Sequence, residues 1–178
     1  VAVLRLISAY RSLGNRAADL NPLDRTHIRQ LPELDPKTYG LTDADMNTPF
    51  HVGTDLSGSP KLPLAEIIRH LKQIYCGPLA LEYMHIPDTA EREWLQARLE
   101  ANGARPQFDA ETKRRILKEI TAAETMERYL HTRYVGQKRF SLEGGESTVP
   151  ALNHLIRAST EKGVQEIVIG MAHRGRLN

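Results

Sequence analysis

The residues best suited to chemistry lie near the end of the sequence, in a basic loop that follows an apolar run. Residues 166–171 are apolar and rich in β-branched side chains, which predicts a strand. His173, Arg174, Gly175 and Arg176 come next. Histidine can move a proton near neutral pH, and arginine offers a rigid fork of donors to carboxylates or phosphates. Since ligands of α/β proteins bind beyond the carboxyl ends of strands, this loop is a candidate site, and a solvated basic loop is the alternative.

A glycine pair before a predicted helix is the second candidate. Gly144 and Gly145 lie near the end of the stretch 138–146. Free N–H groups at a helix N-terminus attract anions, but Glu143 and Glu146 disfavour an anion here. We therefore favour a turn that needs positive φ at glycine. The alternatives are that the glutamates are ion-pair partners, or that they are acid/base groups near a cofactor.

Other polar side chains favour structural interpretations. His85 lies in the apolar run 82–86, and a lone histidine of this kind is more often packed than a ligand. Glu124 and Glu127 share a predicted helix with Arg128, which indicates a solvated face. The remaining histidines have no spacing typical of metal ligands.

The elements that must position these residues are mostly helices. Apolar periodicity, glycine terminators and the capping residues Asp88 and Asp109 predict them. An irregular arm covers residues 15–36. The expected helices span 1–13, 63–75, 88–103, 109–136 and 147–162. The predicted fold is mainly α, with a helical region over 1–105 and the start of an α/β domain over 106–178; a boundary near 136–145 is the alternative.

Composition narrows the class of protein. The 178 residues are 40% hydrophobic and 26% charged, which is typical of a folded chain. A net charge of +2 gives no support for nucleic-acid binding, and no run approaches the roughly 20 apolar residues of a membrane span. The single Cys76 excludes an internal disulfide. A helical start without methionine, and a candidate site at the far end, suggest the front piece of a larger catalytic protein.

Several stretches of the sequence form a recognisable set, namely 7–23, 75–78 with 82–86, 121–124 with 127–130, 138–146 and 170–178. Together they resemble one enzyme family, the thiamine-diphosphate-dependent first component of the 2-oxoglutarate dehydrogenase complex. The resemblance extends over nearly the whole chain, and its last two stretches are long and specific.

The resemblance implies an N-terminal fragment of a homodimeric enzyme that uses thiamine diphosphate and Mg²⁺. Such an enzyme decarboxylates 2-oxoglutarate and passes the succinyl group to the lipoyl group of the succinyltransferase component. His173 would then be the catalytic residue at the substrate, and Arg174 would bind the cofactor diphosphate, with Arg176 supporting the loop. The family's Gly-Asp-Gly cofactor segment is not found here, so the metal ligands are expected outside this chain, and the fragment alone is expected to be inactive.

Two other functions stay open at this point. The same chemistry on 2-oxoadipate differs by one methylene, which is worth about 1–3 kcal/mol in a pocket. The isolated chain is alternatively a helical interaction segment without activity. The expected location is the cytoplasm for a bacterial protein and the mitochondrial matrix for a eukaryotic one.

Overall fold

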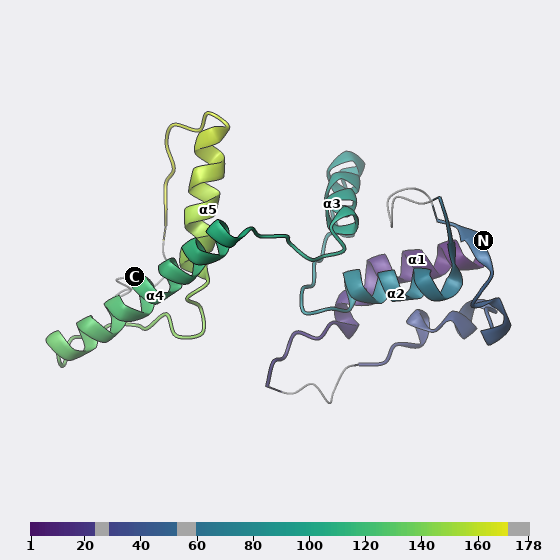
Figure 1. The fold of residues 1–178 in the computed structure, drawn as a ribbon, viewed down its shortest axis with the longest axis horizontal. Coiled ribbons are helices and arrows are strands. Elements are labelled where there is room, and N and C mark those ends of the chain that lie inside the picture. Colours follow the sequence, from purple (N-terminus) through teal and green to yellow (C-terminus); the bar gives the residue numbers. More distant parts are fainter. Residues whose placement is uncertain (24–28, 53–59, 171–178) are drawn as a thin grey trace. The chain divides into compact units, whose positions relative to one another are not determined.

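The computed structural model describes residues 1–23, 29–52 and 60–170, which group into two compact units (Figure 1). Unit 1 is Val1–Pro106 and unit 2 is Gln107–Asn178. No helix in these described ranges is long and apolar enough to cross a membrane. The helices are α1 (Ala2–Leu13), α2 (Leu64–Tyr75), α3 (Thr89–Ala101), α4 (Ala110–Arg133) and α5 (Thr148–Glu161). The mainly α fold is thereby confirmed.

The core of unit 1 lies between α1 and α2, which run side by side (Figure 1). Both helices place apolar residues three and four positions apart, so that each has one apolar stripe. Burying these stripes removes apolar surface from water, which stabilises the pair. The buried side chains are Val3, Leu6, Ile7 and Tyr10 of α1 and Leu64, Ile67, Leu71, Ile74 and Tyr75 of α2.

The ends of these two helices approach each other at Gly14. The backbone of Gly14 is right-handed, with φ −58°, so its role is not to supply a left-handed turn. A β-carbon at this position would lie 2.5 Å from the Cβ of Tyr75. The glycine therefore permits close packing of α1 against α2, in addition to following the end of α1 as predicted.

A short hairpin precedes α2 and was not predicted. Strand β1 (Pro49–His51) pairs antiparallel with β2 (Lys61–Pro63), and Phe50 is opposite Leu62. Each strand has three residues, which is too short for a recognisable alternation of polar and apolar side chains. Short 3₁₀ turns lie at the start of the irregular arm (Gly14–Ala17), within it (Pro32–Leu34) and at its end (Pro36–Tyr39).

A buried polar cluster connects α3 to the rest of unit 1. The Glu100 carboxylate has an exposed side-chain fraction of 0% and accepts hydrogen bonds from Arg11 Nε at 2.8 Å and Nη2 at 2.9 Å. It also accepts one from the Tyr75 hydroxyl, which lies 3.3 Å from the hydroxyl of Tyr83. This Glu100 cluster ties three helices and the 79–88 segment together.

Charge and burial act on the ionisation of the Glu100 cluster. Burial disfavours the charged guanidinium of Arg11, but the hydrogen bonds and charge of Glu100 outweigh it and raise the Arg11 pKa. Burial, followed by the nearby carboxylate, raises the Tyr75 pKa. Both groups therefore keep their protons at neutral pH, and Arg11 remains the counter-ion of Glu100.

Unit 2 is built from α4 and α5, which contact each other. The Asp109 carboxylate accepts a hydrogen bond from Thr112 N at 2.7 Å and so caps α4, as the sequence predicts. This hydrogen bond lowers the pKa of Asp109, because it favours the carboxylate. Pro150 is tolerated because it lies in the first turn of α5.

The predicted strand after α5 is not formed among the described residues. Ile167, Val168 and Ile169 are exposed, Val168 to 95%, and residues 164–170 have no strand partner. A strand needs backbone hydrogen bonds to a neighbour, and the described part of unit 2 offers none. A run of β-branched residues is therefore not sufficient by itself to form a strand.

Candidate functional site

The two predicted site residues, His173 and Arg174, lie outside the described residues, as does Arg176. Their assignment as catalytic and diphosphate-binding residues stays a prediction. The other candidate residues lie within the described ranges.

The stretch 138–146 folds back onto α4. Leu142 N donates a hydrogen bond to Glu127 Oε1 at 2.5 Å, and Leu142 itself is buried. The carboxylate of Glu127 thus fixes the loop to the helix across 15 positions of sequence. Glu127 is half-buried, so the prediction of a wholly solvated face was wrong for this residue.

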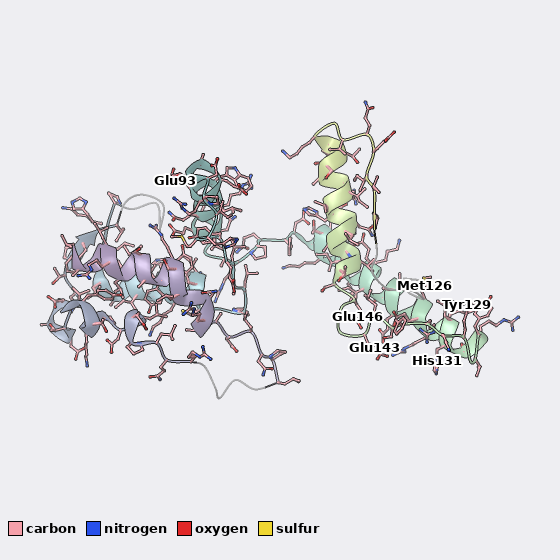
Figure 2. The ribbon with its side chains drawn as sticks, turned by 180° about the vertical axis from the view of Figure 1, so that it is seen from behind. Glu93, Met126, Tyr129, His131, Glu143 and Glu146 are labelled. Carbon is pink, nitrogen blue, oxygen red and sulfur yellow. The ribbon has the colours of Figure 1, made fainter. Side chains whose placement is uncertain are left out.

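A polar hollow forms where this loop meets the helix. Glu124 on the same helix pairs with Arg128 Nη2 at 2.6 Å, and both side chains are exposed, as predicted. Figure 2 shows Glu143, Glu146 and His131 at this part of unit 2. The hollow is lined by Glu124, Glu127, Arg128, His131, Thr132, Arg139, Ser141, Glu143 and Glu146.

The chemistry available in the polar hollow is limited. Acidic side chains and cations alternate around it, and most are exposed to water, which weakens their interactions. Within the described ranges, no group of three or more His, Cys, Asp or Glu side chains is placed to hold a metal ion. The hollow therefore orients the loop before α5, and no ligand-binding arrangement is evident in it.

The glycine pair forms the turn that the sequence predicts. Gly144 has φ 82°, a left-handed conformation that favours glycine. Its N–H donates to Glu146 Oε1 at 3.0 Å. Because Glu146 already occupies this donor, the turn is a structural junction, and the favoured interpretation is confirmed.

The prediction that His85 is packed was wrong. His85 is exposed, whereas its neighbour Tyr83 is buried and reaches the hydroxyl of Tyr75. His85 borders a shallow hollow together with Arg11 and Arg16. In this non-helical segment, the aromatic residue and not the histidine faces the core.

Sequence reasoning missed the Glu100 cluster completely. Neither Arg11 nor Glu100 was singled out in the sequence. The two residues are 89 positions apart, and no local pattern in the sequence connects them.

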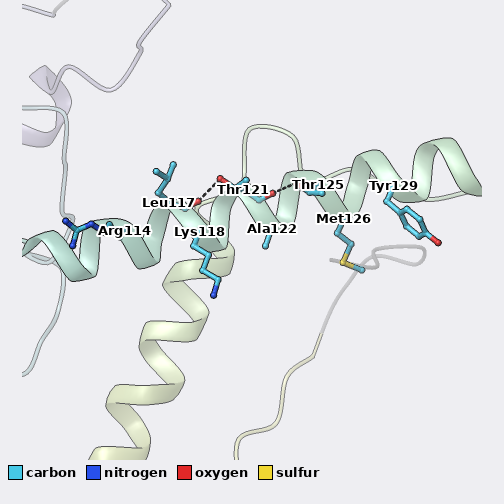
Figure 3. Close-up of a pocket in the computed structure, with 8 residues that line it drawn as sticks. All are labelled: Arg114, Leu117, Lys118, Thr121, Ala122, Thr125, Met126 and Tyr129. Carbon is cyan, nitrogen blue, oxygen red and sulfur yellow. Dashed lines mark hydrogen bonds between the residues drawn. The ribbon is translucent and has the colours of Figure 1, made fainter.

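One face of α4 is apolar and open to solvent. Figure 3 shows Leu117, Met126 and Tyr129 along this face, with the cations of Arg114 and Lys118 at one end. The two threonines between them bond backward along the helix, Thr121 Oγ1 to Leu117 O at 2.8 Å and Thr125 Oγ1 to Thr121 O at 2.7 Å. Their polar groups are therefore satisfied locally, and the methyl groups extend the apolar face.

Several bacterial enzymes are similar to this chain. The 2-oxoglutarate dehydrogenase E1 component of Cupriavidus necator is 50% identical over 178 residues, which is the whole chain and 19% of that protein. The same component of Azotobacter vinelandii is 46% identical over the whole chain and 19% of its own length. A multifunctional 2-oxoglutarate metabolism enzyme of Mycolicibacterium vanbaalenii is 44% identical over 99% of the chain and 14% of its length. No family model matches.

This similarity extends over the whole chain. The chain is homologous to one part of the 2-oxoglutarate dehydrogenase E1 component. The resemblance seen in the sequence is thereby confirmed. The chain spans about a fifth of the length of the E1 components that it matches.

The structure brings together two of the stretches that resemble the E1 component. Residues 121–130 supply the helix side of the polar hollow, and residues 138–146 supply its loop side. The hydrogen bond between Glu127 and Leu142 joins them. A resemblance that is split in sequence is thus continuous in space.

Proposed function

We propose that this chain is part of an enzyme that catalyses the oxidative decarboxylation of 2-oxoglutarate and transfers the succinyl group to a lipoyl group. One observation carries the proposal: 50% identity over all 178 residues to a protein named 2-oxoglutarate dehydrogenase E1 component. The partner would be the lipoyl-bearing succinyltransferase component. The complete enzyme would act as a homodimer.

Thiamine diphosphate and Mg²⁺ are the proposed cofactors, and bound thiamine diphosphate would supply an electron sink for decarboxylation. From this chain, Arg174 would hold the diphosphate, because a guanidinium forms paired hydrogen bonds with phosphate oxygens. His173 would donate a hydrogen bond or a proton at the substrate. Arg176 would support the loop. The metal ligands would come from residues outside this chain.

The glycine turn at 144–145 is a poor candidate for the diphosphate. Its amide at Gly144 is already bonded to Glu146, and a second carboxylate, Glu143, lies beside it. Phosphate oxygens would meet like charge there. This observation supports the choice of Arg174 over the turn as the cofactor-binding part of this chain.

The test is a turnover assay of the full-length protein with 2-oxoglutarate and, separately, with 2-oxoadipate. Faster turnover of 2-oxoglutarate is the expected result. Preference for 2-oxoadipate would change the substrate, and no turnover of either acid would favour a helical interaction segment.

The 178-residue chain alone should show no decarboxylation and little affinity for thiamine diphosphate. A single charge-assisted contact from Arg174 is worth about 1.5–3 kcal/mol. A micromolar site requires about 8 kcal/mol. Calorimetry that detects micromolar binding to this chain would contradict the proposed division of the cofactor site.

A further inference from the structure

The hydroxyl of Tyr10 is buried without a hydrogen-bond partner among the described residues. Tyr10 has an exposed fraction of only 1% and lies in the core of unit 1. Buried polar groups in proteins are nearly always bonded, and an unbonded hydroxyl costs about 1–3 kcal/mol. Such a hydroxyl needs a hydrogen-bond partner from outside the chain, either a ligand or a solvent molecule.

Tyr10 borders a pocket between α1, α2 and the irregular arm. Leu34 and Asp35 of the arm and Lys72 and Cys76 at the end of α2 line the same pocket. Burial raises the pKa of Tyr10, and the nearby Cys76 and Asp35 add to the effect. We call this the Tyr10 pocket.

Donors dominate the polar lining of the Tyr10 pocket. Burial raises the pKa of the Cys76 thiol to about 11, so both this thiol and the Tyr10 hydroxyl are protonated at neutral pH and can donate. Lys72 and Arg29 add an ammonium and a guanidinium. These side chains have no acceptor to offer, apart from weak acceptance by the hydroxyl and thiol.

The carboxylate that lines the pocket is partly engaged within the protein. Asp35 is its one carboxylate among the described residues, and it accepts a hydrogen bond from Lys37 N at 2.9 Å. Two cations and one carboxylate leave the lining with a net positive charge. Gln30, whose amide can donate and accept, also lines the pocket, and Ala17, Leu31, Leu34 and Pro36 form its apolar walls.

We propose that the Tyr10 pocket binds a small carboxylate with a short aliphatic body. The carboxylate accepts a hydrogen bond from Tyr10 and pairs with Lys72 and Arg29, and the aliphatic part lies against Leu31 and Leu34. This site does not depend on the decarboxylation proposed above. A carboxylate supplies an acceptor for the Tyr10 hydroxyl and a negative charge for the two cations, and an aliphatic body fills the apolar remainder.

The test uses sodium butyrate as the probe and the full 178-residue chain labelled with ¹⁵N. Butyrate is titrated at constant ionic strength, with 1-butanol and inorganic phosphate as reference ligands. Saturable amide shifts are expected at Leu34, Asp35, Lys72 and Cys76, with weaker binding of both references. No saturable shift, or equal binding of 1-butanol or phosphate, would overturn the proposal.

Two variants locate the binding. Tyr10→Phe removes one hydrogen bond to a charged group and should weaken butyrate binding about tenfold. Lys72→Met should also weaken it about tenfold, and Lys72 is exposed, so this change leaves the core intact. Tyr129→Phe and Lys113→Met are matched controls in unit 2 and should leave the affinity unchanged.

The folding of the Tyr10 variant provides an independent measurement. Because Tyr10→Phe removes an unbonded hydroxyl, the unliganded variant should melt no lower than the parent. A lower melting temperature would show that the hydroxyl has a partner within the protein, which would overturn the premise. Unchanged butyrate affinity in both Tyr10→Phe and Lys72→Met would overturn the site.

Discussion

At the scale of single residues, the chain contains two ion pairs whose surroundings differ. In the Glu100 cluster the carboxylate is fully buried and Arg11 is 23% exposed, whereas Arg128 and Glu124 are 79% and 52% exposed. Water screens the second pair, and it should contribute little. The first pair should matter mainly because breaking it leaves a buried charge without a counter-ion.

Replacing Arg11 by Met should therefore destabilise the chain by about 2–3 kcal/mol. This loss is smaller than that for a wholly buried ion pair, because Arg11 keeps some contact with water. Arg128→Met is the matched control and should cost about 0–1 kcal/mol. Adding Glu100→Gln to Arg11→Met should recover part of the loss, since the charge is removed. The free energy of unfolding in urea is the measurement, and equal costs of the two arginine changes would contradict this account.

The proposed roles of His173 and Arg174 also belong to this scale. In the full-length enzyme, His173→Ala should lower kcat about 10²-fold, because its hydrogen bond would strengthen as charge develops on the substrate. Arg174→Ala should instead raise the concentration of thiamine diphosphate that activity requires, because Arg174 would bind the diphosphate equally in the ground state and in the transition state. Titration of the cofactor against activity distinguishes them. Rescue of the His173 variant, and not the Arg174 variant, by excess cofactor would reverse the assignment.

At the scale of elements, the helices could be predicted because their signals are local. The apolar stripes of α1 and α2 and the caps at Asp88 and Asp109 depend on residues within a few positions of each other. The β1–β2 hairpin could not be predicted, because three residues give too little pattern. The strand predicted over 166–171 is not formed among the described residues, because β-branched residues form a strand only when a neighbour supplies hydrogen bonds.

The polar contacts follow the same rule. The bond from Gly144 to Glu146 spans two positions, and the turn there was predicted. The contact of Arg11 with Glu100 depends on how α1, α2 and α3 pack, which no local spacing reveals. Long-range pairing, rather than residue chemistry, is what sequence reasoning lacked here.

Gly14→Ala tests whether packing between α1 and α2 determines this position. Alanine favours helical backbone over glycine by about 1 kcal/mol, so propensity alone predicts stabilisation. The 2.5 Å approach to Tyr75 Cβ predicts the opposite, a loss of about 1–3 kcal/mol from overpacking. Gly170→Ala, with no atom within 4 Å, is the control. The direction of the change in melting temperature distinguishes the two expectations. A raised melting temperature for Gly14→Ala would refute the packing role.

At the scale of the whole molecule, the two units differ in how much apolar surface they bury. Unit 1 has a continuous core between α1 and α2. In the described part of unit 2, Ala123 and Leu142 are the buried hydrophobic side chains, and most large apolar residues are exposed. These exposed residues include Leu117, Met126 and Tyr129 of α4, Leu152 and Leu155 of α5, and Ile167, Val168 and Ile169.

Hydrogen exchange should reveal this difference. A helix as short as α5 is marginal in water without tertiary packing, so its amides should exchange faster than those of α1 and α2 in the 178-residue chain. The E1 components that it matches are about five times longer. In a polypeptide of that length, we expect further chain to cover the apolar face of α5 and to pair with residues 167–169, which slows exchange in both. Peptide-resolved exchange of the two proteins, with α1 peptides as the internal control, measures this. Equal exchange of α5 and residues 164–170 in both proteins would show that unit 2 gains nothing from the longer chain.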